Sequence, residues 1–265
     1  RGGSATVHFP IWHQEIEDIL VLKNNKGTED NRVRKLDYSI QISKLFYERF
    51  IKNEDITLFS PNNTPGLYEA FGMPEFDELY LKYEKDKSIP KSTIGAQELF
   101  MDLLKERAET GRIYIMNIDH CNTHSSFKDK VYMSNLCQEI TLPTTPIQHI
   151  DDKEGEIALC ILSAINLGLL TEIDELEELC DLSVRALDEI IDYQEYPVQA
   201  AKISTQARRS LGIGYIGLAH YLAKNQVSYE HKTAAKLVDK VTEAFQFYLL
   251  KASNNLAKEK SKCLW

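Results

Sequence analysis

The spacing of apolar residues along the chain predicts several short β-strands. Residues 112–118 alternate between apolar and polar side chains, as a strand with one buried face does. Residues 4–9 and 55–60 are further strand candidates, and a turn-forming stretch at 61–66 follows the second of them. Residues 157–164 form a short apolar run, which favours a strand buried on both of its faces.

Other segments repeat their apolar residues at helical spacing. Ser92 or Thr93 would cap a helix that runs to Thr110 and stops at Gly111. Further helices are predicted at 12–23, in two patches of 67–87 and over most of 172–260. A long amphipathic pattern covers residues 33–53, with apolar positions at Leu36, Ile40, Ile42, Leu45, Phe46 and Phe50.

Strands separated by long helices are typical of the α/β fold class, in which most strands run parallel. The last third of the chain is rich in predicted helix. Because the sequence contains no internal repeat, low-complexity tract or linker, we expect residues 1–265 to belong to a single domain.

Composition and charge exclude some classes of protein. The chain has 265 residues, of which 43% are hydrophobic, enough to bury a core. It contains no apolar run of about 20 residues, so we do not expect a membrane span. The net charge of −9 disfavours a surface for direct nucleic-acid binding. Nucleotide binding remains open, because a phosphate needs only a few local donors.

The cysteines favour a reducing compartment. Their number is odd, their spacing is wide, and no secretion signal opens the chain, so we expect a cytoplasmic protein. The chain begins at Arg1 without a Met and ends at Trp265, and we therefore expect it to be part of a longer protein. The cysteines are Cys121, Cys137, Cys160, Cys180 and Cys263.

The segment "SNLCQEI" at 134–140 spaces an amide, a thiol and a carboxylate two residues apart. In an extended chain Asn135, Cys137 and Glu139 would point to the same side. One interpretation is a polar turn with an inert cysteine. In the other, Cys137 reacts, Glu139 exchanges a proton and Asn135 orients the substrate.

The charges around Cys137 bear on the type of chemistry. No His, Lys or Arg occurs between Lys130 and His149, and a thiolate nucleophile usually has a cation beside it. A neutral thiol next to a carboxylate fits hydrogen-atom chemistry better than nucleophilic attack, unless the fold brings a distant cation close. Cys160 either packs in the strand at 157–164 or faces Cys137 as a redox partner.

Three further motifs favour structural interpretations. "DHCNTH" at 119–124 has no zinc-ligand spacing, so we expect a hydrogen-bonded loop and no metal site. "GIGYIG" at 212–217 matches a dinucleotide-binding fingerprint, but a polar, helix-like segment precedes it, and close helix packing explains its small residues better. "RGGS" at 1–4 is either a loop that approaches a base or phosphate or a flexible end.

Taken in order, long motifs of this chain resemble the large, catalytic subunit of class I ribonucleotide reductase, of the bacterial and T-even phage type. A cobalamin-dependent relative is a less similar alternative. The resemblance covers essentially the whole chain and rests on "RGGSATVHFPIWH", "VLKNNKGTEDNRVRKLDY", "LFSPNNTPGLY", "GRIYIMNIDHCNTHS", "SNLCQEI", "GEIALCILSAINLG", "YPVQAAKISTQARRSLGIGYIGLAHYLAK" and "YLLKASNNLAKEKSKCLW".

This resemblance implies a ten-stranded α/β barrel with the reactive cysteine on an internal finger loop. Cys137 matches the thiyl-radical cysteine that removes the 3′ hydrogen of a ribonucleoside diphosphate. Glu139 matches the carboxylate that takes the 3′-hydroxyl proton, and Asn135 matches the amide that holds the ribose. Cys160 matches one of two reducing cysteines, whose upstream partner this chain lacks. Arg1 and Gly2 match the end of the loop that relays effector identity to the substrate site.

The resemblance also implies partners and limits. The radical would come from a separate small (beta) subunit with a diiron-tyrosyl centre, so this chain would bind no cofactor itself. A second large subunit, thioredoxin or glutaredoxin, and ATP or deoxynucleotide effectors would act on the complete enzyme, in the host cytoplasm if a phage encodes it. The family's N-terminal regulatory domain, C-terminal barrel half and tail find no match here. We therefore expect the middle of a catalytic barrel that is inactive alone; the alternative is a silent assembly or regulatory piece.

Overall fold

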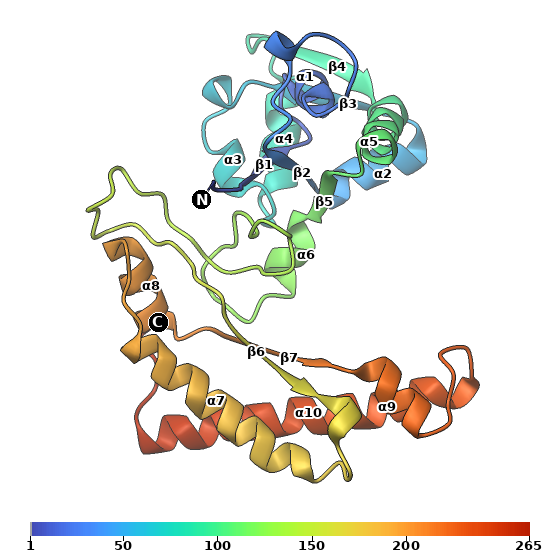
Figure 1. Ribbon diagram of the computed structural model, residues 1–265. Coiled ribbons are helices and arrows are strands. Elements are labelled where there is room, and N and C mark those ends of the chain that lie inside the picture. The colour runs from blue at the N-terminus through green and yellow to red at the C-terminus, as the bar shows by residue number, and fades with distance from the viewer. Residues whose placement is uncertain (1) are drawn as a thin grey trace. The chain divides into compact units, whose positions relative to one another are not determined.

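The computed structural model describes residues 2–265, which form a mixed α/β chain with two compact units (Figure 1). Unit 1 ends at Thr144, and unit 2 runs from Thr145 to Trp265. That the two units belong to one partial domain stays a prediction. Among the described residues, no helix combines the length and the apolar character needed to cross a bilayer.

Unit 1 is built on a parallel sheet of three strands. The central strand β2 (Asp37–Ile42) pairs with β1 (Thr6–Pro10) on one side and with β5 (Ile113–Asn117) on the other. The register places His8 beside Ser39 and Ser39 beside Tyr114, so the two faces of the sheet can be assigned from the pairing. One face carries Phe9, Ile40 and Ile115, whereas the other carries Thr6, His8, Ser39, Gln41 and Met116.

The apolar face of this sheet joins the core of unit 1. The largest fully buried side chains there are aromatic: Trp12, Phe46, Phe59, Phe71, Phe76 and Tyr80. An antiparallel pair of strands, β3 (Asp55–Phe59) and β4 (Lys91–Gly95), packs with this core. The helices of unit 1 are α1 (Ile16–Val21), α2 (Lys44–Lys52), α3 (Leu67–Ala70), α4 (Phe76–Lys85), α5 (Ala96–Thr110) and α6 (Ile118–Thr123).

Unit 2 pairs two parallel strands with helices. Strand β6 (Ile161–Asn166) lies beside β7 (Leu211–Ile216), and no closed sheet is formed by the strands that the structure describes. The long helices α7 (Glu175–Tyr193) and α10 (Lys232–Glu259) lie alongside each other and enclose Cys180, Val241 and Phe245 (Figure 1). Helices α8 (Gln199–Arg208) and α9 (Leu218–Lys224) flank β7 in the chain.

Several sequence-based predictions are confirmed. The strands expected at 4–9, 55–60 and 112–118 are β1, β3 and β5. Gly111 ends α5 in the left-handed conformation, with φ +66°, which glycine adopts at little cost. The parallel pairings in both units agree with the predicted α/β class.

Other predictions are wrong. Residues 33–53 form a strand followed by a helix, because Tyr38, Ile40 and Ile42 are buried on one face of β2 while Ser39 and Gln41 are buried on the other. Ser92 and Thr93 lie in β4 and do not cap α5. The segment 119–124 does not form the expected loop, because all of it except His124 lies in helix α6 (Ile118–Thr123), which directly follows β5.

Two errors concern unit 2. Strand β6 is not buried on both faces, since Leu162 is 55% exposed. "GIGYIG" is mostly strand β7. Gly212 and Gly217 allow close packing against the neighbouring strand and the turn that follows it rather than against a helix, whereas Gly214 has open space around it. A Cβ on Gly212 would lie 2.5 Å from Leu162, and one on Gly217, with φ +75°, would lie 2.2 Å from Asn166 Oδ1.

Candidate active site

The predicted reactive cysteine lies on an irregular segment, residues 131–140, which we call the cysteine loop. The extended backbone expected for this segment is wrong. Its chain turns at Leu136 and Cys137, where the Gln138 N–H donates to the Asn135 carbonyl over 3.2 Å. Gln138 then takes a left-handed conformation with φ +65°, which is unusual for a residue with a side chain.

The polar face of the parallel sheet holds this loop. On β1, the Thr6 hydroxyl donates to the Leu136 carbonyl at 2.7 Å. On β2, the Gln41 side chain donates to the Tyr132 carbonyl at 2.6 Å. Because Thr6 and Gln41 share one face, the cysteine loop lies over that face.

Gln138 provides the strongest attachment. Its Oε1 accepts a hydrogen bond of 2.6 Å from the hydroxyl of Ser39, which is fully buried. Its Nε2 donates over 2.6 Å to the carbonyl of Ile115 on β5. Two such bonds contribute about 1–3 kcal/mol in total, which is comparable to the cost of about 1–3 kcal/mol for a strained backbone conformation.

The three predicted residues of the site differ in their surroundings. Cys137 and Glu139 are exposed. Asn135 is half-buried, and its Oδ1 accepts from the N–H of Ile140 at 3.1 Å, while Ser134 donates to the carbonyl of the same Ile140. This contact orients the amide, so the Asn135 NH₂ group is the part that can donate to a ligand.

Two basic residues, His8 and Lys130, lie near the cysteine loop, and the contacts described for them are with groups other than the Cys137 thiol. The ring nitrogens of His8 are buried and make no hydrogen bond within the described part of the chain. Burial lowers the pKa of His8, and an interaction with the Ser134 backbone opposes that shift only in part. The imidazole is therefore neutral at pH 7.

Lys130 is the basic residue nearest to Cys137 in the preceding sequence. Its Nζ donates to the carbonyl of Glu69 at 2.5 Å, at the end of α3, and lies 4.4 Å from the centre of the Tyr132 ring. Burial lowers the pKa of Lys130 to about 8. The Lys130 amine therefore contacts α3 and the Tyr132 ring. These contacts agree with hydrogen-atom chemistry at Cys137, which stays a prediction.

The remaining predicted site residues lie elsewhere. Cys160 is exposed and directly precedes β6 in unit 2, so its pairing with another cysteine and its approach to Cys137 stay predictions. Arg1 lies outside the described residues. Gly2 is exposed, and a Cβ placed on it would meet nothing within 4 Å. Their role toward an effector also stays a prediction.

Sequence reasoning missed the residues that hold the loop: Thr6, Ser39, Gln41 and Gln138. A signal for two of them was present, because Ser39 and Gln41 alternate with Tyr38, Ile40 and Ile42 and so share the opposite face of an extended strand. In the structure these side chains are 0% and 1% exposed, and polar groups buried to this degree need hydrogen-bond partners.

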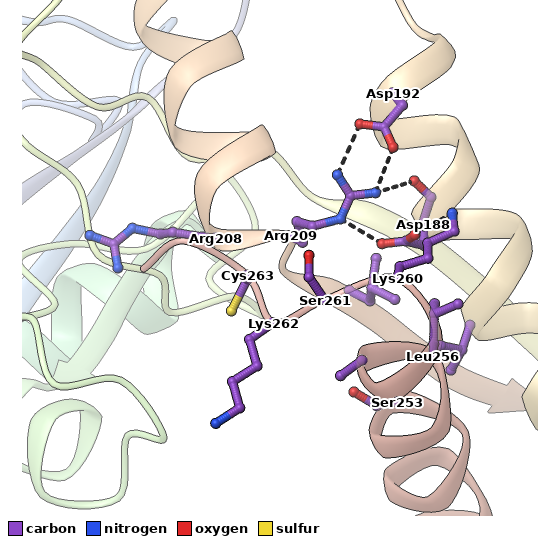
Figure 2. Close-up of a pocket in the computed structure, with 13 residues that line it drawn as sticks. Asp188, Asp192, Arg208, Arg209, Ser253, Leu256, Lys260, Ser261, Lys262 and Cys263 are labelled. Carbon is purple, nitrogen blue, oxygen red and sulfur yellow. Dashed lines mark hydrogen bonds and ion pairs between the residues drawn. The ribbon is translucent and has the colours of Figure 1, made fainter.

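Unit 2 contains a cavity of about 540 Å³ between α7, α8 and the end of α10 (Figure 2). Arg209 fills one side of it and pairs with Asp188 at 2.6 Å and Asp192 at 2.9 Å. Lys260 pairs with Asp188 at 3.0 Å, and Cys263 also lines the wall. These charges compensate each other, so the cavity shows a structural ion-pair network rather than an arrangement for catalysis.

No metal centre is apparent in the part of the chain that the structure describes. None of its His, Cys, Asp and Glu side chains form a group of three that could hold an ion. Within "DHCNTH", the rings of His120 and His124 pack edge to face, with centroids 5.3 Å apart.

Comparisons with known proteins agree on one family. The family model described as "Ribonucleotide reductase, barrel domain" matches residues 1–264. The chain is 59% identical to the "Ribonucleoside-diphosphate reductase subunit alpha" of Buchnera aphidicola (subsp. Schizaphis graminum), covering 99% of this chain and 35% of that protein.

Two further relatives bear similar names. Identity is 57% to "Ribonucleoside-diphosphate reductase 1 subunit alpha" of Escherichia coli, over 100% of this chain and 36% of the relative. It is 46% to the "Ribonucleoside-diphosphate reductase subunit alpha" of Enterobacteria phage T4, over 98% of this chain and 35% of the relative. The chain thus spans about a third of the length of the curated relatives it matches.

Proposed function

Because the chain belongs to the family of ribonucleotide reductase barrel domains, we propose that it supplies the cysteine loop of a ribonucleoside-diphosphate reductase. The reaction converts ribonucleoside diphosphates into the 2′-deoxy forms that DNA synthesis needs. The observation that carries the proposal is the cysteine loop itself, which presents an exposed thiol from a backbone fixed to three strands. We further propose that β1, β2 and β5 belong to a ten-stranded barrel whose interior contains this loop.

Cys137 is the proposed site of the radical. As a thiyl radical, its sulfur removes the 3′ hydrogen atom of the substrate ribose and becomes a thiol. Returning that hydrogen atom at the end regenerates the radical, so Cys137 is not consumed. Such a cycle requires the sulfur to reach the same carbon twice, and a backbone that is hydrogen-bonded on both sides of Cys137 meets that requirement.

Glu139 and Asn135 are proposed to act on the hydroxyl groups of the ribose. The exposed carboxylate of Glu139 accepts the 3′-hydroxyl proton, and the NH₂ group of Asn135 donates a hydrogen bond to the sugar. The oxygen of the same amide is held by the backbone of Ile140, which fixes the direction of the donor.

The reducing electrons are proposed to come from Cys160 and a second cysteine outside this chain. The 2′-hydroxyl leaves as water, and oxidation of the two thiols to a disulfide supplies two electrons. Thioredoxin or glutaredoxin then reduces the disulfide. A separate beta subunit with a diiron-tyrosyl centre generates the radical, a second alpha subunit completes the assembly, and ATP or deoxynucleotides act as effectors, with Arg1 and Gly2 at the relay.

A turnover assay tests this proposal. The full alpha chain that contains these residues is expressed with its beta subunit and supplied with a ribonucleoside diphosphate and dithiothreitol. We expect deoxynucleotide formation with the native sequence and none with Cys137→Ser. Cys263→Ser is the matched control, because Cys263 is also an exposed cysteine and has no proposed role.

Two outcomes contradict the proposal. One is the absence of any deoxynucleotide from the native alpha and beta subunits. The other is a Cys137→Ser enzyme that is as active as the Cys263→Ser control. The second outcome would favour a chain that only supports assembly.

A further inference from the structure

We infer that Gln138 is a positioning residue for the Cys137 sulfur, which it holds through the backbone of the cysteine loop; the inference rests on the proposed function above. Gln138 is the residue after the cysteine, and its side chain turns back onto the sheet. Its two polar atoms bind two different strands, β2 through Ser39 and β5 through the Ile115 carbonyl.

The geometry assigns this role to Gln138 because the side chain and the backbone act together. The left-handed backbone of Gln138 closes the turn that carries Cys137, with the Gln138 N–H bonded to the Asn135 carbonyl. By itself, the left-handed backbone conformation is energetically unfavourable for a glutamine. The bonds to Ser39 and Ile115 favour it, and the turn therefore depends on them.

The cysteine loop is attached to the sheet on both sides of Cys137. On the other flank of the cysteine, the Leu136 carbonyl accepts a hydrogen bond from Thr6 of β1. Hydrogen bonds therefore fix the peptide groups on both sides of Cys137, while its own side chain stays exposed. Loss of the Gln138 contacts releases the peptide on one side of Cys137, while the Asn135 amide keeps its separate bond to the Ile140 N–H.

The prediction concerns catalytic rate rather than substrate affinity. Because a displaced sulfur reaches the ribose less often, Gln138→Leu lowers kcat at least tenfold and changes KM less than twofold. Ser39→Ala removes only one of the two bonds and lowers kcat about threefold. The double variant is no slower than Gln138→Leu, because both substitutions remove the same Ser39–Gln138 bond.

The experiment uses the full alpha chain with its beta subunit. Activities of Gln138→Leu, Ser39→Ala and the double variant are compared with those of Gln97→Leu, a glutamine whose side chain also donates to a backbone carbonyl but which is exposed on α5. Gln138→Asn is a second variant, since asparagine tolerates the left-handed backbone but is too short to keep both bonds. Thermal melting checks that each variant is folded.

A separate measurement follows the thiol without turnover. The rate at which iodoacetamide alkylates Cys137, read by peptide mass spectrometry, rises at least threefold in Gln138→Leu and Gln138→Asn and is unchanged in Gln97→Leu. Wild-type kcat and alkylation rates in both Gln138 variants, with an active native enzyme, would overturn the inference. An inactive native enzyme with accelerated alkylation in these variants would instead contradict the proposed function and leave the positioning role supported.

Discussion

Gln41 offers a direct test of whether the sheet holds the cysteine loop at its start. Its side chain is 1% exposed, and its Nε2 donates to the Tyr132 carbonyl at 2.6 Å. Gln41→Leu keeps the volume of the side chain approximately but removes the donor. The Tyr132 carbonyl, in a half-buried residue, then loses its partner.

The magnitude follows from the burial of the two groups. A satisfied hydrogen bond contributes about 0.5–1.5 kcal/mol, and an unsatisfied buried partner costs about 1–3 kcal/mol. Because leucine is cheaper to bury than glutamine and Tyr132 is only half-buried, we expect a loss near the middle of these ranges, about 1.5 kcal/mol. That corresponds to a melting temperature lower by about 3–6 °C for a protein of this size.

Urea unfolding at pH 7 measures this loss. The chain has two tryptophans, so a Trp265→Phe background leaves buried Trp12 as the only indole and reports on unit 1. Gln97→Leu is the matched control and should cost less than about 0.5 kcal/mol, as exposed substitutions do. If Gln41→Leu were no more destabilising than Gln97→Leu, the argument that the polar face of the sheet anchors the loop would be refuted.

Three further outcomes follow from other contacts. Glu84 accepts two hydrogen bonds of 2.6 Å from Arg49, so we expect Glu84→Gln to cost about 2–3 kcal/mol of unfolding free energy at pH 7. Arg49 also holds the pKa of Glu84 below its ordinary value of 4.5. The resulting stabilisation is present above pH 4.5 and is lost as the pH falls through the lowered pKa. The difference in unfolding free energy between wild type and Glu84→Gln, measured by urea unfolding, should therefore shrink on acidification. Gly217→Ala should cost about 2–4 kcal/mol in the same assay, because its φ is +75° and the new Cβ meets Asn166, whereas the control Gly214→Ala, with open space around it, should cost much less. Burial lowers the pKa of Lys130 to about 8 from an ordinary 10.5, so the unfolded chain binds more protons than the folded one between these pH values. The unfolding free energy of the wild type should therefore rise from pH 8 to 10.5 relative to that of Lys130→Met. Parallel curves of unfolding free energy against pH would contradict this assignment.

The sequence predicted elements well where one face is apolar and the other polar. The alternating stretch at 112–118 is such a case, and it is strand β5. Prediction failed at 33–53, because the apolar residues Ile40, Ile42, Leu45 and Phe46 of β2 and α2 together fit a helical spacing that hides the alternation of β2. The burial of the polar residues Ser39 and Gln41 depends on tertiary partners, which the local period of the sequence does not reveal.

The sequence singled out the residues of the candidate site but did not predict the shape of the segment that carries them. The spacing of Asn135, Cys137 and Glu139 drew attention to this segment, and the roles of the three residues stay predictions. An extended chain was expected, whereas the structure has a turn with a left-handed Gln138. Contacts with residues far away in the sequence stabilise this turn, including one to Ser39, 99 positions before Gln138. A left-handed glutamine is locally unfavourable, so the tertiary hydrogen bonds decide the outcome.

The buried polar residues of β2 connect the stability of unit 1 to the chemistry proposed for its cysteine. Ser39 and Gln41 would each be costly to bury without a partner, and the cysteine loop provides both partners, Gln138 and the Tyr132 carbonyl. The sheet therefore completes its hydrogen bonds only when the loop is in place, and the loop keeps its turn only when the sheet is formed. These hydrogen bonds use the backbone and side chains on either side of Cys137, so they fix the position of the sulfur without using the thiol itself. A residue that must be both rigidly placed and open to substrate is best held in this way, through its neighbours.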